Sequence, residues 1–288
     1  MARRRTNPKP ADAIAELWPV PWSDSAAALL KTLHILTREG ALNADSRRKL
    51  KQVLHLTQVL CAPIERLLAE EEDPVIADLG AGKSYLGFIL YDLVLGPAGR
   101  GRVVGVEARA DLVEGARNLA RECAFARMAF LHAPIATAQL PGGRAHMVTA
   151  LHACDTATDE AILFALRHGA QTVALIPCCQ AELAAALAGH KGALHQLWRH
   201  PIQRREFGAH ATNVLRALYL EAHGYKVRVT ELTGWEHSLK NELILAERHQ
   251  PSNAQARAEF TRLADQLGVR PRLLDAASVP QGEGATVR

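Results

Sequence analysis

The spacing of hydrophobic positions changes near residue 73, and this change divides the chain into two patterns. Over residues 12–72 the apolar positions recur every three or four residues, which is the spacing of amphipathic helices. Two helices are predicted there, over residues 26–36 and 43–71. Pro63 lies inside the second and is expected to kink or split it, because proline lacks a backbone N–H.

After residue 73, short apolar runs alternate with helical patterns. Strands that alternate with helices are typical of a largely parallel sheet covered on both faces, so the predicted class is a three-layer α/β fold. The last two strands have no helix between them, which favours an antiparallel pair. The predicted strands cover residues 75–79, 103–107, 128–131, 146–151, 172–176, 226–231 and 242–246, and the predicted helices 85–95, 111–123, 158–168, 212–223 and 254–267.

These patterns predict four regions along the chain. Residues 1–10 are polar and basic and are expected to form a flexible arm. Residues 11–72 form a helical region that is expected to help bind a substrate. Residues 73–248 form the α/β domain. Residues 249–288 are expected to hold one short helix followed by a disordered tail.

Composition indicates a folded protein outside the membrane. Hydrophobic residues make up 48% of the chain and charged residues 22%, which is ordinary for globular proteins. No apolar stretch approaches the roughly 20 residues that a membrane span needs. Five cysteines, of which Cys178 and Cys179 are adjacent, do not suggest a disulfide framework, so a reducing, cytoplasmic location is expected. The net charge of +4 permits a nucleic-acid partner without requiring one.

The strongest local motif is D-L-G-A-G at residues 78–82, between a predicted strand and a predicted helix. Its glycines allow a tight turn and close approach of a ligand to the backbone. Tyr85 stands where a dinucleotide fingerprint has its third glycine, and Asp78 would repel a phosphate. Glu107 ends the next strand, where a carboxylate can accept hydrogen bonds from two ribose hydroxyls. The alternative is a plain strand–turn–helix connection with a solvated glutamate.

This motif, followed by V-V-G-V-E at residues 103–107, resembles motif I and the ribose-binding acid of class I S-adenosylmethionine-dependent methyltransferases. The order of elements is also similar to the seven-stranded, Rossmann-like sheet of that family. The resemblance implies methyl transfer as the activity and S-adenosylmethionine as the cofactor of residues 73–248. The implied cofactor-binding residues are Asp78, Gly80, Ala81, Gly82, Glu107, Ala108, His132 and Leu151. The acid that often follows the third strand in this family is missing from L-H-A-P at residues 131–134.

Two further segments, L-H-A-C-D at residues 151–155 and P-C-C-Q at residues 177–180, resemble a narrower branch that includes the tRNA 2′-O-ribose methyltransferases. Motif I of that branch commonly reads G-A-G-K-G, and Ser84 replaces its last glycine here. Gln180 and Ala181 stand where the tRNA enzymes have histidines. The tetrapeptide N/D-P-P-Y of enzymes that methylate exocyclic amines is absent, which weighs against amino-group methylation.

The ends of the fourth and fifth strands supply the catalytic candidates His152, Cys154, Asp155, Cys178 and Cys179. Strand carboxyl ends line the ligand crevice in such sheets. His152 or Asp155 could take a proton from an attacking hydroxyl or amine, unless the histidine is simply buried and satisfied by the backbone. The cysteines could bind zinc, attack a pyrimidine ring, or pack beneath the cofactor. Packing is favoured and no metal site is predicted, because adjacent cysteines cannot easily share one tetrahedral centre.

Three basic clusters, together with the resemblance to the narrower branch, favour RNA, either rRNA or tRNA, as the substrate. They lie at residues 3–5, at residues 47–51, and at residues 191–207, where Trp198 could stack on a base. Charge runs of this kind are also found on merely solvated surfaces. A protein or small-molecule acceptor, or a binding module that has lost turnover, is the alternative function.

Overall fold

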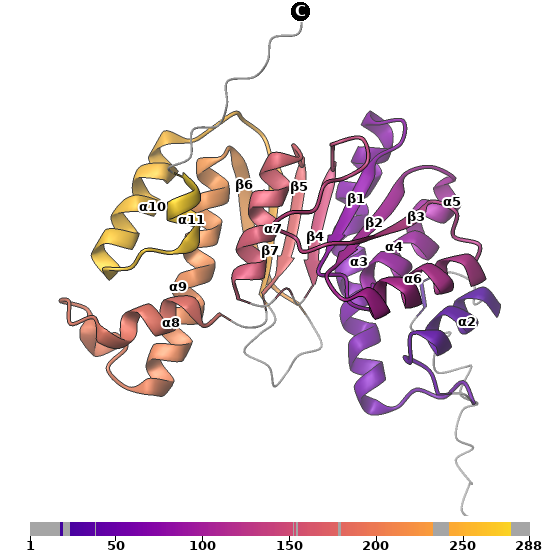
Figure 1. The fold of residues 1–288 in the computed structure, drawn as a ribbon, viewed down its shortest axis with the longest axis horizontal. Helices are drawn as coiled ribbons and strands as arrows, with labels where there is room; N and C mark the ends of the chain where they lie inside the picture. Colours follow the sequence, from indigo (N-terminus) through magenta and orange to yellow (C-terminus); the bar gives the residue numbers. More distant parts are fainter. Residues whose placement is uncertain are drawn as a thin grey trace, which may run out of the picture.

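The computed structural model describes residues 18–19, 24–37, 39–151, 153, 155–177, 180–232 and 242–277. Its centre is a seven-stranded sheet in the order β3-β2-β1-β4-β5-β7-β6 (Figure 1). The first five strands are parallel, and β7 runs antiparallel to both β5 and β6. The strands are β1 (Val75–Leu79), β2 (Arg102–Glu107), β3 (Met128–His132), β4 (Met147–Leu151), β5 (Thr172–Ile176), β6 (Tyr225–Glu231) and β7 (Glu242–Arg248). The predicted three-layer α/β class and antiparallel pair are confirmed.

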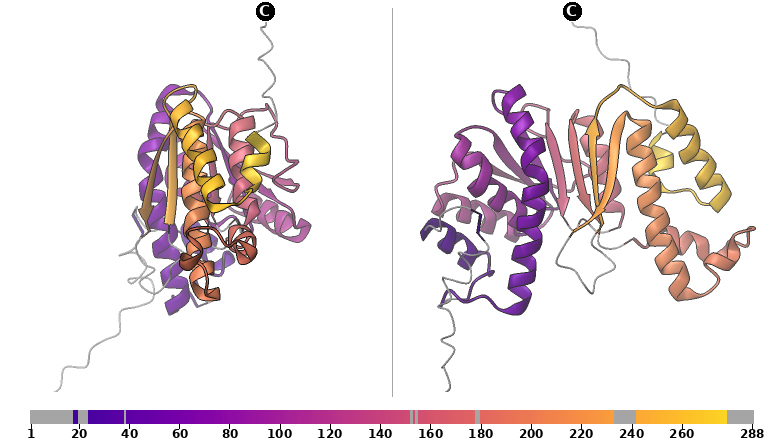
Figure 2. Two further views of the ribbon diagram at one scale, coloured as in Figure 1. Left: turned by 90° about the vertical axis from the view of Figure 1, so that its left-hand side faces the viewer. Right: turned by 180° about the vertical axis from the view of Figure 1, so that it is seen from behind.

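Helices cover both faces of this sheet (Figure 2). They are α2 (Asp24–Thr32), α3 (Ala44–Glu70), α4 (Tyr85–Leu90) with a π-helical extension (Tyr91–Leu95), α5 (Gly96–Ala98), α6 (Ala110–Glu122), α7 (Thr156–Arg167), α8 (Glu182–Ala186), α9 (Pro201–Ala222), α10 (Ala254–Leu267) and α11 (Arg272–Ala277). Successive strand residues point to opposite faces, so each face has its own core. Ile76 belongs to the core that includes residues of α2, α3, α4 and α6, while Ala77 belongs to the core that includes residues of α7, α9 and α10. Among the described residues, no helix is both long and apolar enough to cross a bilayer.

Helix α3 runs unbroken through Pro63, so of the expected kink or split the split is wrong. Asn43 caps its start by accepting a hydrogen bond from the Ser46 backbone N–H at 2.8 Å. Leu60 and Ile64, on either side of the proline, are fully buried in the core that α3 shares with α4 and the sheet. We attribute the continuity of the helix to this packing, since proline itself removes one helical hydrogen bond. The separate substrate-binding role predicted for residues 11–72 stays a prediction.

The helices differ most from the sequence predictions at α2, α9 and α11. Helix α2 ends at Thr32 instead of residue 36, because His34 takes the left-handed conformation, with φ +57°. Helix α9 begins at Pro201 instead of residue 212, with proline at a first-turn position that needs no N–H donor. A short helix, α11, follows α10 where a disordered tail was expected. Residues 278–288 and the basic arm at residues 1–10 lie outside the described residues.

Candidate cofactor and acceptor site

The loop between β1 and α4 lies where the parallel strands end. Gly80 and Gly82 have φ of +61° and +58°, a region that residues with a side chain rarely adopt. The Ala81 backbone N–H donates to the Val106 carbonyl of β2 at 3.0 Å, which fixes the turn against the sheet. The backbone of residues 80–82 stays partly exposed at this edge. The tight glycine turn that the sequence predicted is therefore observed, and the approach of a ligand to it stays a prediction.

Asp78 lies beneath this loop and only 2% of its surface is exposed. Its Oδ2 accepts a hydrogen bond from Ser84 Oγ, and its Oδ1 accepts one from Thr149 Oγ1 of β4, both at 3.0 Å. Burial raises the pKa of this carboxyl to about 6, although the Ser84, Thr149 and Gly87 donors oppose the rise. Asp78 therefore ties the loop to β4. The direct contact with the cofactor that the resemblance implies stays a prediction.

Ser84 occupies the position of the last glycine in G-A-G-K-G and keeps the backbone conformation that glycine favours, with φ +53°. Its side chain is completely buried, and the hydrogen bond to Asp78 uses its hydroxyl. A Cβ atom added at Gly87 would lie 2.4 Å from Ser84 Oγ. Gly87 thus leaves room for this hydroxyl, a requirement that no sequence motif indicated.

Glu107, at the end of β2, lies against the same loop with 8% of its surface exposed. Its Oε2 accepts a hydrogen bond from the Gly82 backbone N–H at 2.7 Å, and its Oε1 accepts one from the Arg109 backbone N–H at 3.0 Å. Beside it, His132 Nε2 lies 3.0 Å from the Ala108 carbonyl oxygen. The structure therefore brings the predicted cofactor residues of β1, β2 and β3 to one edge. Their contacts with the cofactor stay predictions.

The catalytic candidates are only partly described. His152, Cys154, Cys178 and Cys179 lie outside the described residues, so their roles stay predictions. Leu151 ends β4 beside Ile176 of β5. Elsewhere in the described chain, no three His, Cys, Asp or Glu side chains are grouped closely enough to hold a metal ion.

Asp155 joins the segment after β4 to the segment after β5. Its Oδ1 accepts hydrogen bonds from the backbone N–H groups of Ala181 at 2.9 Å and Glu182 at 3.1 Å. Its own backbone has φ +51° and ψ −125°, which is a strained conformation for a residue with a side chain. This geometry describes a positioning role, and proton transfer by Asp155 stays a prediction.

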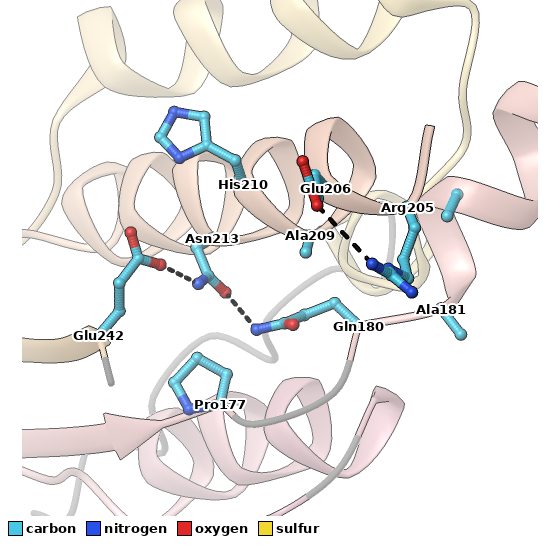
Figure 3. A pocket seen from close by; sticks show the side chains of 10 residues that line it. Pro177, Gln180, Ala181, Arg205, Glu206, Ala209, His210, Asn213 and Glu242 are labelled. Atoms are coloured by element: carbon cyan, nitrogen blue, oxygen red, sulfur yellow. Dashed lines mark hydrogen bonds and ion pairs between the residues drawn. The ribbon is translucent and has the colours of Figure 1, made fainter. Parts of the chain in front are cut away.

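A cavity of about 660 Å³ opens at the ends of β5 and β7 (Figure 3). Pro177 and Gln180 line it from the segment after β5, Asn213 from α9, and Glu242 from the start of β7. Neighbouring strands lie about 4.8 Å apart, and β5 is the second strand from β1, so these two strands lie about 10 Å apart across the sheet. Sequence reasoning missed Asn213 and Glu242, which belong to no motif.

Trp198 does not offer a face for base stacking, so that prediction is wrong. Only 1% of its surface is exposed, its indole N–H donates to the His190 carbonyl at 3.1 Å, and its ring packs 5.3 Å from that of Phe207. A large aromatic side chain in a segment between a strand and a helix is better buried than exposed. It anchors the segment that precedes α9.

Comparisons with known proteins find one family model and several solved structures that are similar to this chain. Residues 48–186 match a family model described as a methyltransferase domain. Similar solved structures include a SAM-dependent methyltransferase from Aquifex aeolicus, 16% identical over 63% of this chain and 86% of that chain, with a TM-score of 0.37. Another is an rRNA methylase from Streptococcus thermophilus, 8% identical over 62% and 89%, with a TM-score of 0.41. A third is the magnesium protoporphyrin IX methyltransferase from Synechocystis, 14% identical over 77% and 95%, with a TM-score of 0.43. No curated protein matches the sequence.

The strand order agrees with the seven-stranded sheet that the resemblance implies, and the match over residues 48–186, just under half of the chain, supports an S-adenosylmethionine-dependent methyltransferase. Such an enzyme takes its methyl group from S-adenosylmethionine, and the residues at the carboxyl edge fit this cofactor. Glu107 offers a carboxylate of the kind that accepts ribose hydroxyls, and the glycine turn leaves its backbone open. The narrower resemblance to tRNA ribose methyltransferases stays a prediction.

Proposed function

We propose that this methyltransferase acts on RNA. The observation that carries the proposal is the position of two basic segments at the carboxyl edge of the sheet. Helix α3 begins at this edge on one side, and the segment leading into α9 lies at the same edge on the other (Figure 2). The cofactor loop and the cavity lie at this edge too, which is where an extended polyanion would reach both.

The basic side chains of these segments are open to solvent. Arg48 and Lys51 are exposed on α3, and Lys191, Arg199 and Arg205 are exposed before and within the start of α9. Arg48 pairs with Asp45, and Arg205 lies 3.7 Å from Glu206. Within the described part of the chain, Lys51 and Lys191 have no ion-pair partner. When exposed lysines of this kind neutralise phosphates, counterions condensed on the nucleic acid are released, and this release favours binding.

For methyl transfer the protein chiefly has to align the cofactor and the acceptor. When bound, S-adenosylmethionine supplies a methyl group that its sulfonium already makes electrophilic. The glycine turn and Glu107 would hold the cofactor, and well-oriented reactants gain about 7–11 kcal/mol over free encounter. His152 or Asp155 would accept the proton of an attacking hydroxyl. The narrower resemblance favours tRNA or rRNA as the acceptor.

Transfer of labelled methyl groups tests the proposal. The purified protein is incubated with methyl-labelled S-adenosylmethionine and an extract of cells that lack its gene, and the products are digested with nuclease or protease. Label that nuclease alone releases supports RNA, and nucleoside analysis then identifies the methylated atom. Label that only protease releases moves the assignment to a protein acceptor. Label confined to small molecules, or none, excludes RNA. The Glu107→Ala variant is the control for cofactor-dependent transfer.

A further inference from the structure

The buried guanidinium of Arg216 sets the hydrogen-bonding directions beside the cavity. Arg216 is 1% exposed. Its Nε donates to Asp159 Oδ1 at 2.6 Å, and its Nη2 donates to Asp159 Oδ2 at 3.2 Å and to the Asp155 carbonyl at 2.7 Å. A guanidinium is always protonated and can only donate hydrogen bonds. Any group that its remaining nitrogen contacts must therefore present an acceptor.

That remaining contact orients two amides in turn. Arg216 Nη1 donates to Asn213 Oδ1 at 3.3 Å, so the amide nitrogen of Asn213 must point away from Arg216. This nitrogen donates to the carboxylate of Glu242, and Gln180 Nε2 donates to the same Asn213 oxygen at 3.2 Å (Figure 3). Amide orientations are otherwise ambiguous, but here one fixed cation determines both.

The result is that Gln180 and Glu242 present acceptors on one side of the cavity. The Nε2 of Gln180 is directed at Asn213, which leaves its Oε1 as the group to meet a ligand, and Glu242 brings a carboxylate. A carboxylate accepts about four hydrogen bonds and an amide oxygen two, so both keep capacity beyond their contacts with Asn213. The remaining lining is partly apolar, from Pro177 and three alanines, and partly polar, from His210 and from Arg205, which lies 3.7 Å from Glu206. Such a wall suits a flat ring with N–H groups on one edge.

We propose that this cavity binds a guanine base of the RNA, which rests on the proposed function. Guanine alone among the four bases presents two adjacent N–H donors, N1–H and N2–H, on its Watson–Crick edge, and these match the two oxygens of one carboxylate. Adenine, cytosine and uracil place an acceptor beside their donor, and that acceptor would face the oxygens of Glu242. A volume of about 660 Å³ is within the usual range of small-ligand sites and accommodates a base turned out of its strand.

Binding of defined oligonucleotides tests this inference. The probes are fluorescent uridine decamers that are unmodified or carry one central guanosine or inosine. We expect wild-type protein to bind the guanosine decamer about 10-fold more tightly than the all-uridine decamer, with inosine between them because it lacks the 2-amino group. In Glu242→Gln the amide nitrogen faces the guanine donors, so the preference should vanish while affinity for the all-uridine decamer persists.

Two further variants keep the result interpretable. Gln180→Ala removes the second acceptor from a half-exposed position and should lower the preference in part. Glu70→Gln, exposed at the far end of α3, is the matched control and should keep the full preference. Equal binding of all decamers by wild-type protein, or an unchanged preference in Glu242→Gln, overturns the guanine site and leaves the RNA proposal standing. Failure to bind any decamer, together with no label in RNA, overturns both.

Discussion

The hydroxyl and the backbone of Ser84 make opposite contributions that two substitutions can separate. Both Ser84→Ala and Ser84→Gly remove the hydrogen bond to buried Asp78, but only glycine accommodates the left-handed backbone without strain. We therefore expect Ser84→Ala to be about 1 kcal/mol less stable than Ser84→Gly. Urea unfolding of the two variants measures this difference. Equal midpoints would mean that the backbone at residue 84 is not strained.

Asp78 should make stability fall as the pH rises through the mildly acidic range. Burial raises its pKa from an ordinary value of 3.8 to about 6, so between these values the folded protein holds a proton that the unfolded chain has lost. The stabilisation from this proton is complete below about pH 4 and is lost by about pH 6, a loss on the order of 3 kcal/mol.

Comparison with Asp78→Asn isolates this effect from other titrating groups. The amide does not titrate, so the difference in unfolding free energy between wild type and variant should change with pH between about pH 4 and 6 and level off outside that range. Urea unfolding across this pH range provides the measurement. A difference that stays constant would show that Asp78 ionises as it does in the unfolded chain.

At the scale of helices and strands, the sequence correctly predicted the elements whose positions are determined by a local pattern of residues. The strand expected at residues 172–176 is observed as Thr172–Ile176, because a short run of β-branched and aliphatic residues leaves little choice. The start of α9 at Pro201 was missed because residues 201–211 mix charge and small residues without a clear stripe. Pro63 was expected to kink or split α3, and the helix is not split because packing on both sides of the proline prevailed over this local preference.

The cofactor loop and the cavity also differ in how far the sequence could predict them. The glycine turn and Glu107 could be predicted because a contiguous motif and the next strand end carry them. Asn213 and Glu242 could not be predicted, since Asn213 meets Gln180, 33 residues before it in the chain, and Glu242, 29 residues after it, only in the folded structure. Trp198 was misassigned because a basic neighbourhood says nothing about which way an aromatic ring points.

The contact of Glu107, at the end of β2, with the glycine turn should control the affinity for S-adenosylmethionine. Glu107→Ala removes both the acceptor for the Gly82 backbone and the predicted ribose contact, so we expect S-adenosylmethionine to bind at least about 10-fold more weakly. Calorimetric titration with the cofactor measures the affinity. Glu114→Ala, exposed on α6, is the matched control and should bind like wild type. Unchanged affinity in Glu107→Ala would place the ribose elsewhere.

At the scale of the whole molecule, two basic segments on opposite sides of the carboxyl edge should act on one RNA together. Each lysine that contacts a phosphate contributes about 0.7 to the slope of log affinity against log salt for a single strand. We expect Lys51→Gln and Lys191→Gln each to lower this slope by about that amount, and the double variant by about twice as much. Arg262→Gln, exposed on α10, is the control and should keep the wild-type slope.

The same variants separate the phosphate contacts from the base site. Phosphate contacts position the strand but carry no sequence information, so losing Lys51 or Lys191 should weaken the guanosine and uridine decamers equally. Glu242→Gln should do the reverse, removing the preference while leaving the salt slope intact. Fluorescence anisotropy at several salt concentrations measures both quantities in one experiment. If the lysine variants changed the guanine preference, the lysines would act on the base as well as on the phosphates. The strand would then have to cross the sheet edge along a different path.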